Sequence, residues 1–102
     1  MIYVTVKEKK QNIKELKIEG HAEYGENGKD LVCAGVSSIG VGLLNALDEK
    51  QKDVELNMDD ALIKIKVNNM NDSEIQLMLY VAITQLKTIN ERYPNYIRIE
   101  KE

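Results

Sequence analysis

The only cysteine and the only histidine of the 102-residue chain, Cys33 and His21, lie within one short stretch of sequence. A thiolate is a strong nucleophile, and a histidine, whose pKa is ordinarily about 6.5, can take the proton from a neighbouring thiol. Enzymes that cleave peptide bonds through a cysteine use this pair, and the two residues need not be adjacent in sequence. These residue types therefore predict nucleophilic chemistry, with Cys33 as nucleophile and His21 as general base.

The same two residues also have a purely structural interpretation. A lone cysteine between Val32 and Ala34 is most often a small buried hydrophobe, and a lone histidine at a strand end is usually an ordinary surface or core residue. The distribution of glycine favours the chemical interpretation, because all six glycines of the chain lie between Gly20 and Gly42. The residues alone leave both interpretations open.

The apolar segment that follows Asp30 predicts a helix from residue 31 to about residue 48, with Asp30 as its N-cap. Cys33 would then lie in the first turn, where free N–H groups and the positive end of the helix dipole lower the pKa of a thiol. The N–H groups of Cys33 and Ala34 could also bind the oxyanion of a tetrahedral intermediate. Asp30 could instead orient His21 as the third member of a triad, but we rank the cap first.

The segment between the second predicted strand and this helix predicts a loop, because it contains charges and glycines but no apolar periodicity. Gly20, Gly25 and Gly28 would let its backbone move or let a ligand come close. Such a loop could bring His21 back against the start of the helix.

Small residues follow Cys33 along the predicted helix. Ser37, one turn further on, would share the face of Cys33 and could support it with a hydrogen bond. Gly35 fits substrate access as well as it fits packing. Gly40 and Gly42 are better explained by close packing of the helix against a neighbour, since each glycine costs about 1 kcal/mol in a helix interior.

Alternating apolar and polar residues predict five strands around two helices. The second helix would be capped by Asp72 or Ser73 and stopped by Pro94. The strands are expected at residues 2–6, 16–19, 54–58, 61–67 and 96–100. This ββαββαβ order predicts one α+β domain over residues 1–102, in which two β-hairpins and a C-terminal strand form a mainly antiparallel sheet with the helices packed on it.

Composition and charge exclude several classes of partner. The formal net charge is −3 and the charges alternate along the chain, which argues against direct nucleic-acid binding. No apolar run approaches the roughly 20 residues of a membrane span and no leader is evident, so we expect a cytoplasmic protein without membrane contact. One cysteine and one histidine form neither a disulfide nor a zinc site, and we expect no metal or cofactor. The first helix is apolar almost all round, which indicates a homodimer.

The chain resembles the bacterial ribosomal-processing cysteine protease family, called Prp, in two sequence pieces and in the order of its elements. The pieces are Gly20-His21-Ala22 and Asp30-Leu31-Val32-Cys33-Ala34-Gly35-Val36-Ser37, with a short acidic, glycine-bearing loop between them. The resemblance covers the whole chain and shows no departure at the His, Asp or Cys positions.

The resemblance implies a small homodimer with His21 and Cys33 as its catalytic dyad. It also implies that the enzyme removes a short N-terminal extension from a ribosomal large-subunit protein during ribosome assembly. The loop at residues 22–29 would be mobile and would order on substrate binding, with Gly25 and Gly28 as its hinge. A negatively charged protein suits a basic ribosomal substrate.

Two other functions are compatible with the residues. The chain could be a noncatalytic ribosome-assembly factor or peptide-binding module, in which the loop grips a partner and Cys33 merely packs. A redox sensor is weaker, because the chain contains no second cysteine to resolve an oxidised thiol.

Overall fold

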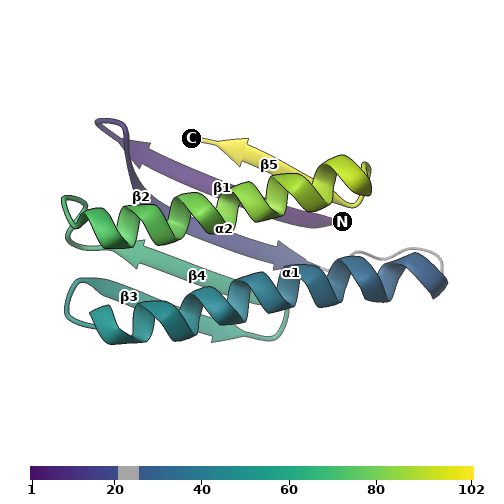
Figure 1. The fold of residues 1–102 in the computed structure, drawn as a ribbon, viewed down its shortest axis with the longest axis horizontal. Coiled ribbons are helices and arrows are strands. Elements are labelled where there is room, and N and C mark those ends of the chain that lie inside the picture. Colours follow the sequence, from purple (N-terminus) through teal and green to yellow (C-terminus); the bar gives the residue numbers. More distant parts are fainter. Residues whose placement is uncertain (21–25) are drawn as a thin grey trace.

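The computed structural model describes the backbone of residues 1–20 and 26–102 and the side chains of residues 1–20 and 31–102. Within these residues, the elements follow the predicted ββαββαβ order, which confirms the predicted fold class (Figure 1). They are β1 (Ile2–Lys9), β2 (Asn12–Gly20), α1 (Glu26–Leu47), the short 3-10 helix η1 (Asp48–Lys50), β3 (Val54–Asp59), β4 (Leu62–Val67), α2 (Ser73–Arg92) and β5 (Ile97–Lys101).

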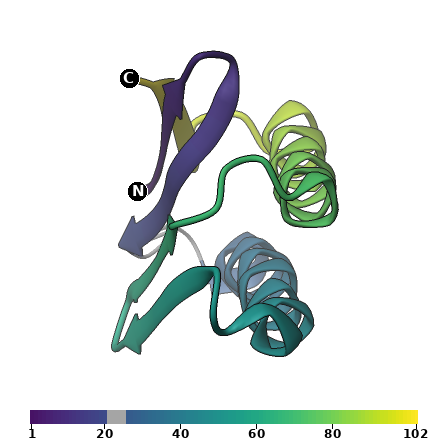
Figure 2. The same cartoon turned by 90° about the vertical axis from the view of Figure 1, so that its left-hand side faces the viewer.

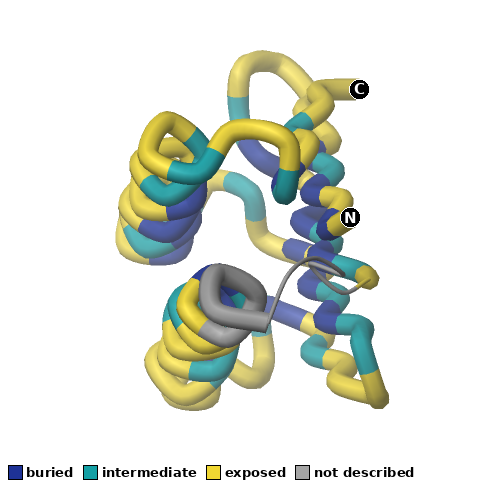
Figure 3. Tube along the Cα trace, turned by 90° about the vertical axis from the view of Figure 1, so that its right-hand side faces the viewer, coloured by how far each residue is buried: buried dark blue, intermediate teal, exposed yellow. Residues whose placement is uncertain are grey.

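The strands form one sheet in the order β3-β4-β2-β1-β5. Neighbouring strands are antiparallel, except that β5 runs parallel to β1. Figure 2 shows both helices against the same face of the sheet, so the molecule has one sheet layer and one helix layer. Figure 3 shows the buried residues of the described chain gathered between these two layers.

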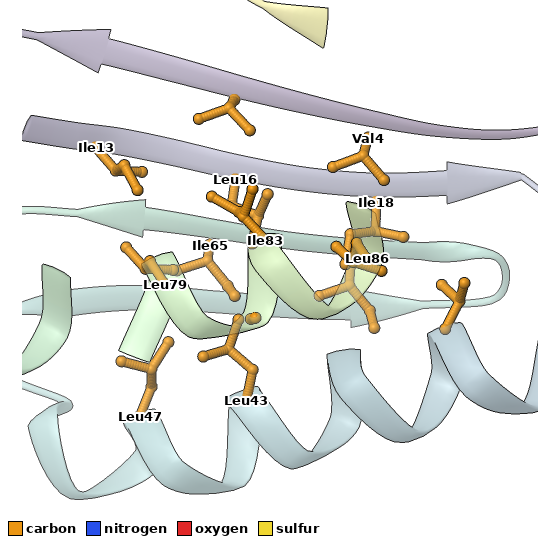
Figure 4. Close-up of a cluster of buried hydrophobic side chains, with 14 of the residues drawn as sticks. Val4, Ile13, Leu16, Ile18, Leu43, Leu47, Ile65, Leu79, Ile83 and Leu86 are labelled. Carbon is orange, nitrogen blue, oxygen red and sulfur yellow. The ribbon is translucent and has the colours of Figure 1, made fainter. Parts of the chain in front are cut away.

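The core follows from the alternation of side chains along the strands. Val4, Ile18 and Ile63 are paired in register across β1, β2 and β4, and all three are buried beneath the helices. The helices contribute Val32, Val36, Leu43 and Leu47 of α1 and Ile75, Leu79, Ala82, Ile83 and Leu86 of α2 to the buried core. Figure 4 shows Leu43, Leu47, Leu79, Ile83 and Leu86 among the side chains of this core.

Asp72, one of the two predicted candidates, is the N-cap of α2, and it also links α2 to η1. Its carboxylate accepts hydrogen bonds from the N–H groups of Glu74 (2.9 Å) and Ile75 (3.1 Å). From the end of η1, the Lys50 ammonium donates to Asp72 Oδ2 (3.1 Å) and to Glu74 Oε1 (2.6 Å). The pKa of Asp72 is held below its ordinary value mainly by the hydrogen bond from the Ile75 N–H and next by the hydrogen bond from Lys50.

α1 begins at Glu26 rather than at residue 31, so it takes in Gly28 and Asp30. The later start was predicted because a carboxylate is a favoured N-cap and because Gly28 lowers helix propensity by about 1 kcal/mol. Acidic residues are also favourable inside the first turns, where they meet the positive end of the helix dipole. Glu26 and Asp30 are therefore compatible with an earlier start.

The segment Leu31–Lys50 has the length and hydropathy of a membrane span, with a mean hydropathy of 1.6. This corrects the expectation that no apolar run approaches that length. In the fold, one face of this helix packs on the sheet, and 28% of the apolar window is buried.

Candidate active site

Cys33 is half-buried and packs against the core, yet it also forms part of the wall of a cavity of about 220 Å³. The cavity lies where α1, the start of β1, the end of β2 and the β3–β4 hairpin meet. Its wall consists of Ile2, Ile18, Gly20, Cys33, Val36, Ser37, Val41, Met58, Asp59, Asp60, Ala61, Leu62 and Ile63. A molecule bound in this cavity would lie beside Cys33.

Cys33 lies beyond the first turn of α1, so the predicted first-turn position is wrong. The N–H groups without an intrahelical partner are the first four of a helix, and α1 begins at Glu26. The N–H groups of Cys33 and Ala34 lie further along, where an α-helix directs them to carbonyls one turn earlier. The oxyanion role of these N–H groups was predicted from a first-turn position, and the structure does not place them there.

Two further predictions change with the earlier helix start. Asp30 is a residue within α1, so its predicted N-cap role is wrong. Its side chain lies outside the described residues, and the role of orienting His21 stays a prediction. Gly28, expected in the loop, also lies within α1. His21 and Gly25 lie outside the described residues, so the dyad and the mobile loop rest on the sequence.

Gly20 brings the backbone that precedes His21 into the cavity wall. Its φ is +97°, and a Cβ at this position would collide with the Met1 carbonyl oxygen, so a glycine is required. The Gly20 N–H donates a hydrogen bond to the Ala61 carbonyl (2.9 Å), which joins the end of β2 to the β3–β4 turn. The described part of the chain thus reaches the wall of the Cys33 cavity at Gly20, the residue before His21.

Ser37 lines the same cavity as Cys33, in agreement with the predicted shared helix face. Its side chain is exposed and makes no hydrogen bond within the described part of the chain. Its supporting role remains a prediction, and the hydroxyl is placed where it would meet a molecule bound beside Cys33.

The glycines of α1 differ in what surrounds them. A Cβ on Gly35 would lie 3.0 Å from Ile89 Cδ1 of α2, which favours packing over substrate access at this position. A Cβ on Gly40 would lie 2.5 Å from Ile63 Cδ1, so the predicted close packing on the sheet is confirmed. A Cβ on Gly42 would meet nothing within 4 Å, so no packing within the described part of the chain explains that glycine.

The β3–β4 hairpin is the part of the site that sequence reasoning missed. Strand alternation predicted the hairpin, but Met58 to Ile63 carry no local signal that places them beside Cys33. Ala61 in the turn of this hairpin has a positive φ of 57°, which is unusual for a residue with a Cβ. Its carbonyl accepts the hydrogen bond from the Gly20 N–H. Metal-binding clusters of three or more His, Cys, Asp or Glu side chains are absent from the described residues.

Cys33 lies in the wall of a cavity, on a helix that packs on the β-sheet of an α+β fold. This arrangement suits an enzyme that acts through a thiol. Comparison with protein families makes the class specific. The family described as cysteine protease Prp matches residues 1–98, and the chain belongs to this family. The chain is therefore a cysteine protease, as the resemblance in sequence implied.

Relatives and solved structures agree with this assignment. The ribosomal processing cysteine protease Prp of Staphylococcus aureus strain Mu50 is 33% identical over 90 residues, which are 85% of this chain and 85% of the relative. A crystal structure of the S. aureus protease with a covalently linked product peptide has a TM-score of 0.89, 32% identity and full coverage of both chains. The same protease in complex with a substrate peptide gives a TM-score of 0.88 and 31% identity, again with full coverage of both chains.

Proposed function

We propose that this chain is an endopeptidase that removes a short N-terminal extension from a ribosomal large-subunit protein during ribosome assembly. The observation that carries the proposal is the position of Cys33 in the wall of a cavity that also contains Gly20, the residue before His21. The relation to a protease named for ribosomal processing supports the class of substrate.

The reaction needs only the thiol, the imidazole and water. His21 removes the proton from Cys33, and the sulfur attacks the scissile carbonyl carbon. The carbon–nitrogen bond of the tetrahedral intermediate then breaks, and His21 gives its proton to the leaving amine. Water attacks the resulting thioester with His21 as base, releases the carboxylate product and restores the thiol.

The test uses a peptide that spans the junction of the extension with the mature ribosomal protein. We expect His21→Ala to lower kcat/KM by about 10²- to 10⁴-fold, the usual contribution of a general base, and Cys33→Ala to lower it at least as much. Circular dichroism and thermal unfolding verify that both variants fold. Folded variants that cleave as fast as the wild type would contradict the proposal.

The alternative is a noncatalytic ribosome-assembly or peptide-binding module with a structural Cys33, and the packing of Cys33 against the core favours it. Alkylation of the thiol by iodoacetamide as a function of pH separates the two functions. A nucleophile paired with His21 reacts quickly near neutral pH, and His21→Ala slows it. A structural cysteine reacts slowly, and its labelling rises only toward the ordinary thiol pKa of about 8.5.

The proposed enzyme acts on a ribosomal protein in the cytoplasm and does not itself bind nucleic acid. On the side of the sheet opposite the helices, two lysines form ion pairs with carboxylates. Lys7 lies 3.4 Å from Glu15, and Lys17 lies 3.6 Å from Glu19. Paired charges of this kind reduce the positive potential that a phosphate backbone requires. A nucleic-acid mobility assay at low salt should therefore give no shift.

The proposed enzyme is a homodimer that associates through the groove between α1 and α2. This groove has a volume of about 500 Å³, and none of the described residues that line it is charged, although 30% of the chain is. Leu77 and Val81 of α2 are 61% and 46% exposed beside it. The groove is lined by Ser38, Ile39, Gly42, Leu43, Ala46, Leu77, Met78, Val81, Ala82 and Gln85.

Two features favour a second copy of the chain as the occupant of this groove. Gly42, which packs against nothing in its own protomer, offers a hollow beside the Leu77 and Val81 ridge, and a two-fold axis would place each ridge near the hollow of the other copy. Glu74 lies in the first turn of α2 and Arg92 in its last turn, so a two-fold axis that sets the two α2 helices antiparallel would bring each Arg92 toward the Glu74 of the other copy, where it would join the ion pair of Glu74 with Lys50 (2.6 Å).

A further inference from the structure

The turn between β3 and β4 forms the charged part of the Cys33 cavity. Among the described residues that line the cavity, which exclude 21–25 and the side chains of 26–30, Asp59 and Asp60 alone carry charge and no lysine or arginine is present. The other lining residues are apolar apart from Ser37 and the glycine, so the carboxylates border a surface with few competing polar groups.

Neither carboxylate is neutralised by a cation within the described part of the chain. Lysines elsewhere do form ion pairs, for example Lys50 with Asp72 and Lys101 with Glu8. Asp59 Oδ1 accepts a hydrogen bond from the Asp60 N–H (2.7 Å), which leaves its second oxygen available. The Asp60 carboxylate makes no hydrogen bond to a described residue. Both side chains are exposed, so a cation can reach them.

The turn that presents these carboxylates is held in place. The Ala61 carbonyl accepts the hydrogen bond from the Gly20 N–H (2.9 Å), and Ala61 adopts a positive φ of 57°. Asp59 and Leu62 are paired in the β3–β4 ladder on either side of the turn. The two charges are thus presented at a defined edge of the cavity that contains the nucleophile, and not on a free loop.

We propose that Asp59 and Asp60 are specificity-determining residues, which select a peptide with a lysine or arginine side chain close to the scissile bond. This inference rests on the proposed protease function of Cys33. In the bound peptide, the cationic side chain lies against the β3–β4 turn, while the apolar part of the cavity accepts a neighbouring uncharged side chain. An acidic side chain at the same position is repelled by the two carboxylates.

The experiment compares pairs of peptides that differ at one position. In each pair, a lysine at one of the three positions on either side of the scissile bond is replaced by norleucine, which keeps the length of the side chain and removes its charge. For the wild type we expect kcat/KM to favour lysine at one position by about threefold per carboxylate, the factor that an exposed ion pair provides. Raising the salt concentration should reduce this preference.

The enzyme variants are Asp59→Asn, Asp60→Asn and the double variant. Each Asn keeps the size of the side chain, and at position 59 it keeps an acceptor for the Asp60 N–H. Either single variant should lower the lysine-to-norleucine ratio, and the double variant should bring it to about one. Asp60→Lys should reverse the preference, so that glutamate is cleaved faster than lysine at that position.

Glu55→Gln is the matched control, because Glu55 is exposed on the same strand but does not line the cavity. It removes the same charge from the whole protein and should leave the ratio unchanged. A ratio that survives in the double variant, or that falls equally with Glu55→Gln, overturns the inference. If instead the wild type cleaves no peptide, or cleaves as fast after Cys33→Ala, the proposed protease function itself fails.

Discussion

Gly40 shows how one missing side chain sets the distance between α1 and the sheet. A Cβ at this position would lie 2.5 Å from Ile63 Cδ1 and 3.7 Å from Ile18 Cδ1. Cβ atoms in proteins essentially never approach another atom as closely as the first of these distances. The helix that carries Cys33 therefore lies closer to β4 than any other residue at position 40 would permit without rearrangement.

Gly40→Ala is expected to destabilise the protein by about 1–3 kcal/mol, the usual effect of overpacking a core. Gly35→Ala is the comparison, because its Cβ would lie 3.0 Å from Cδ1 of Ile89, which is only partly buried, whereas Ile63 is buried in the core and its Cδ1 has less room to move. We expect its free energy of unfolding to change by less than about 1 kcal/mol, since alanine also has the higher helix propensity. Urea unfolding measures both variants. Equal stabilities would show that close contact at position 40 does not limit the packing of α1.

At the scale of the elements, Asp72 couples the start of α2 to the end of η1, and this coupling depends on pH. The pKa of Asp72 is lowered from 3.8 in the folded state, so its charge stabilises the fold at pH values above 3.8. The contribution is lost as the pH falls through the lower folded-state value. The pKa of Lys50 is raised from 10.5, so its charge also stabilises the fold at neutral pH. This contribution is lost only at high pH, as the pH rises above 10.5.

Asp72→Asn is therefore expected to lower the Tm at pH 7, and the difference from the wild type should shrink below about pH 4 as Asp72 becomes protonated. Differential scanning fluorimetry between pH 7 and pH 2.5 measures this difference. Glu91→Gln, at an exposed position of the same helix, should leave the Tm difference from the wild type small at every pH. A constant deficit for Asp72→Asn down to pH 2.5 would show that the Asp72 charge is not responsible.

The elements differ in how far local sequence determines them. α2 was predicted at both ends, because the Asp72 cap and Pro94 act within a few residues of the boundary. The start of α1 was not, because Asp30 suits an N-cap and an early helical turn equally well. The β3–β4 turn was predicted as a turn, but its place beside Cys33 depends on the packing of α1 across the sheet. No local pattern encodes that contact.

At the scale of the whole molecule, the open groove at Gly42 provides the test of the proposed dimer. Gly42→Leu should fold, because the space around position 42 is open within the protomer. It should nevertheless weaken association by at least tenfold, because its side chain fills the hollow proposed for the partner. Thr84→Leu, an exposed substitution outside the lining of this groove, should leave association unchanged.

Sedimentation equilibrium over a range of protein concentrations measures the dissociation constant of the wild type and both variants. A wild type that stays monomeric throughout, or a Gly42→Leu variant that associates as tightly as the wild type, would contradict the proposed interface. A helix of Leu31–Lys50 with only 28% of its apolar window buried in one protomer agrees with association through this face.

The pairing of β1 with β5 has a consequence for the order in which the chain folds. Ile2 is paired with Ile97, so the first and last strands of the sheet come together across almost the whole sequence. Contacts with so large a sequence separation carry a high loop-closure entropy and form slowly. During synthesis, β1 can pair with β2 at once, but its other edge stays open until β5 has emerged. The five-stranded sheet is thus completed only after β5, the last of its strands in sequence order, is available to pair with β1.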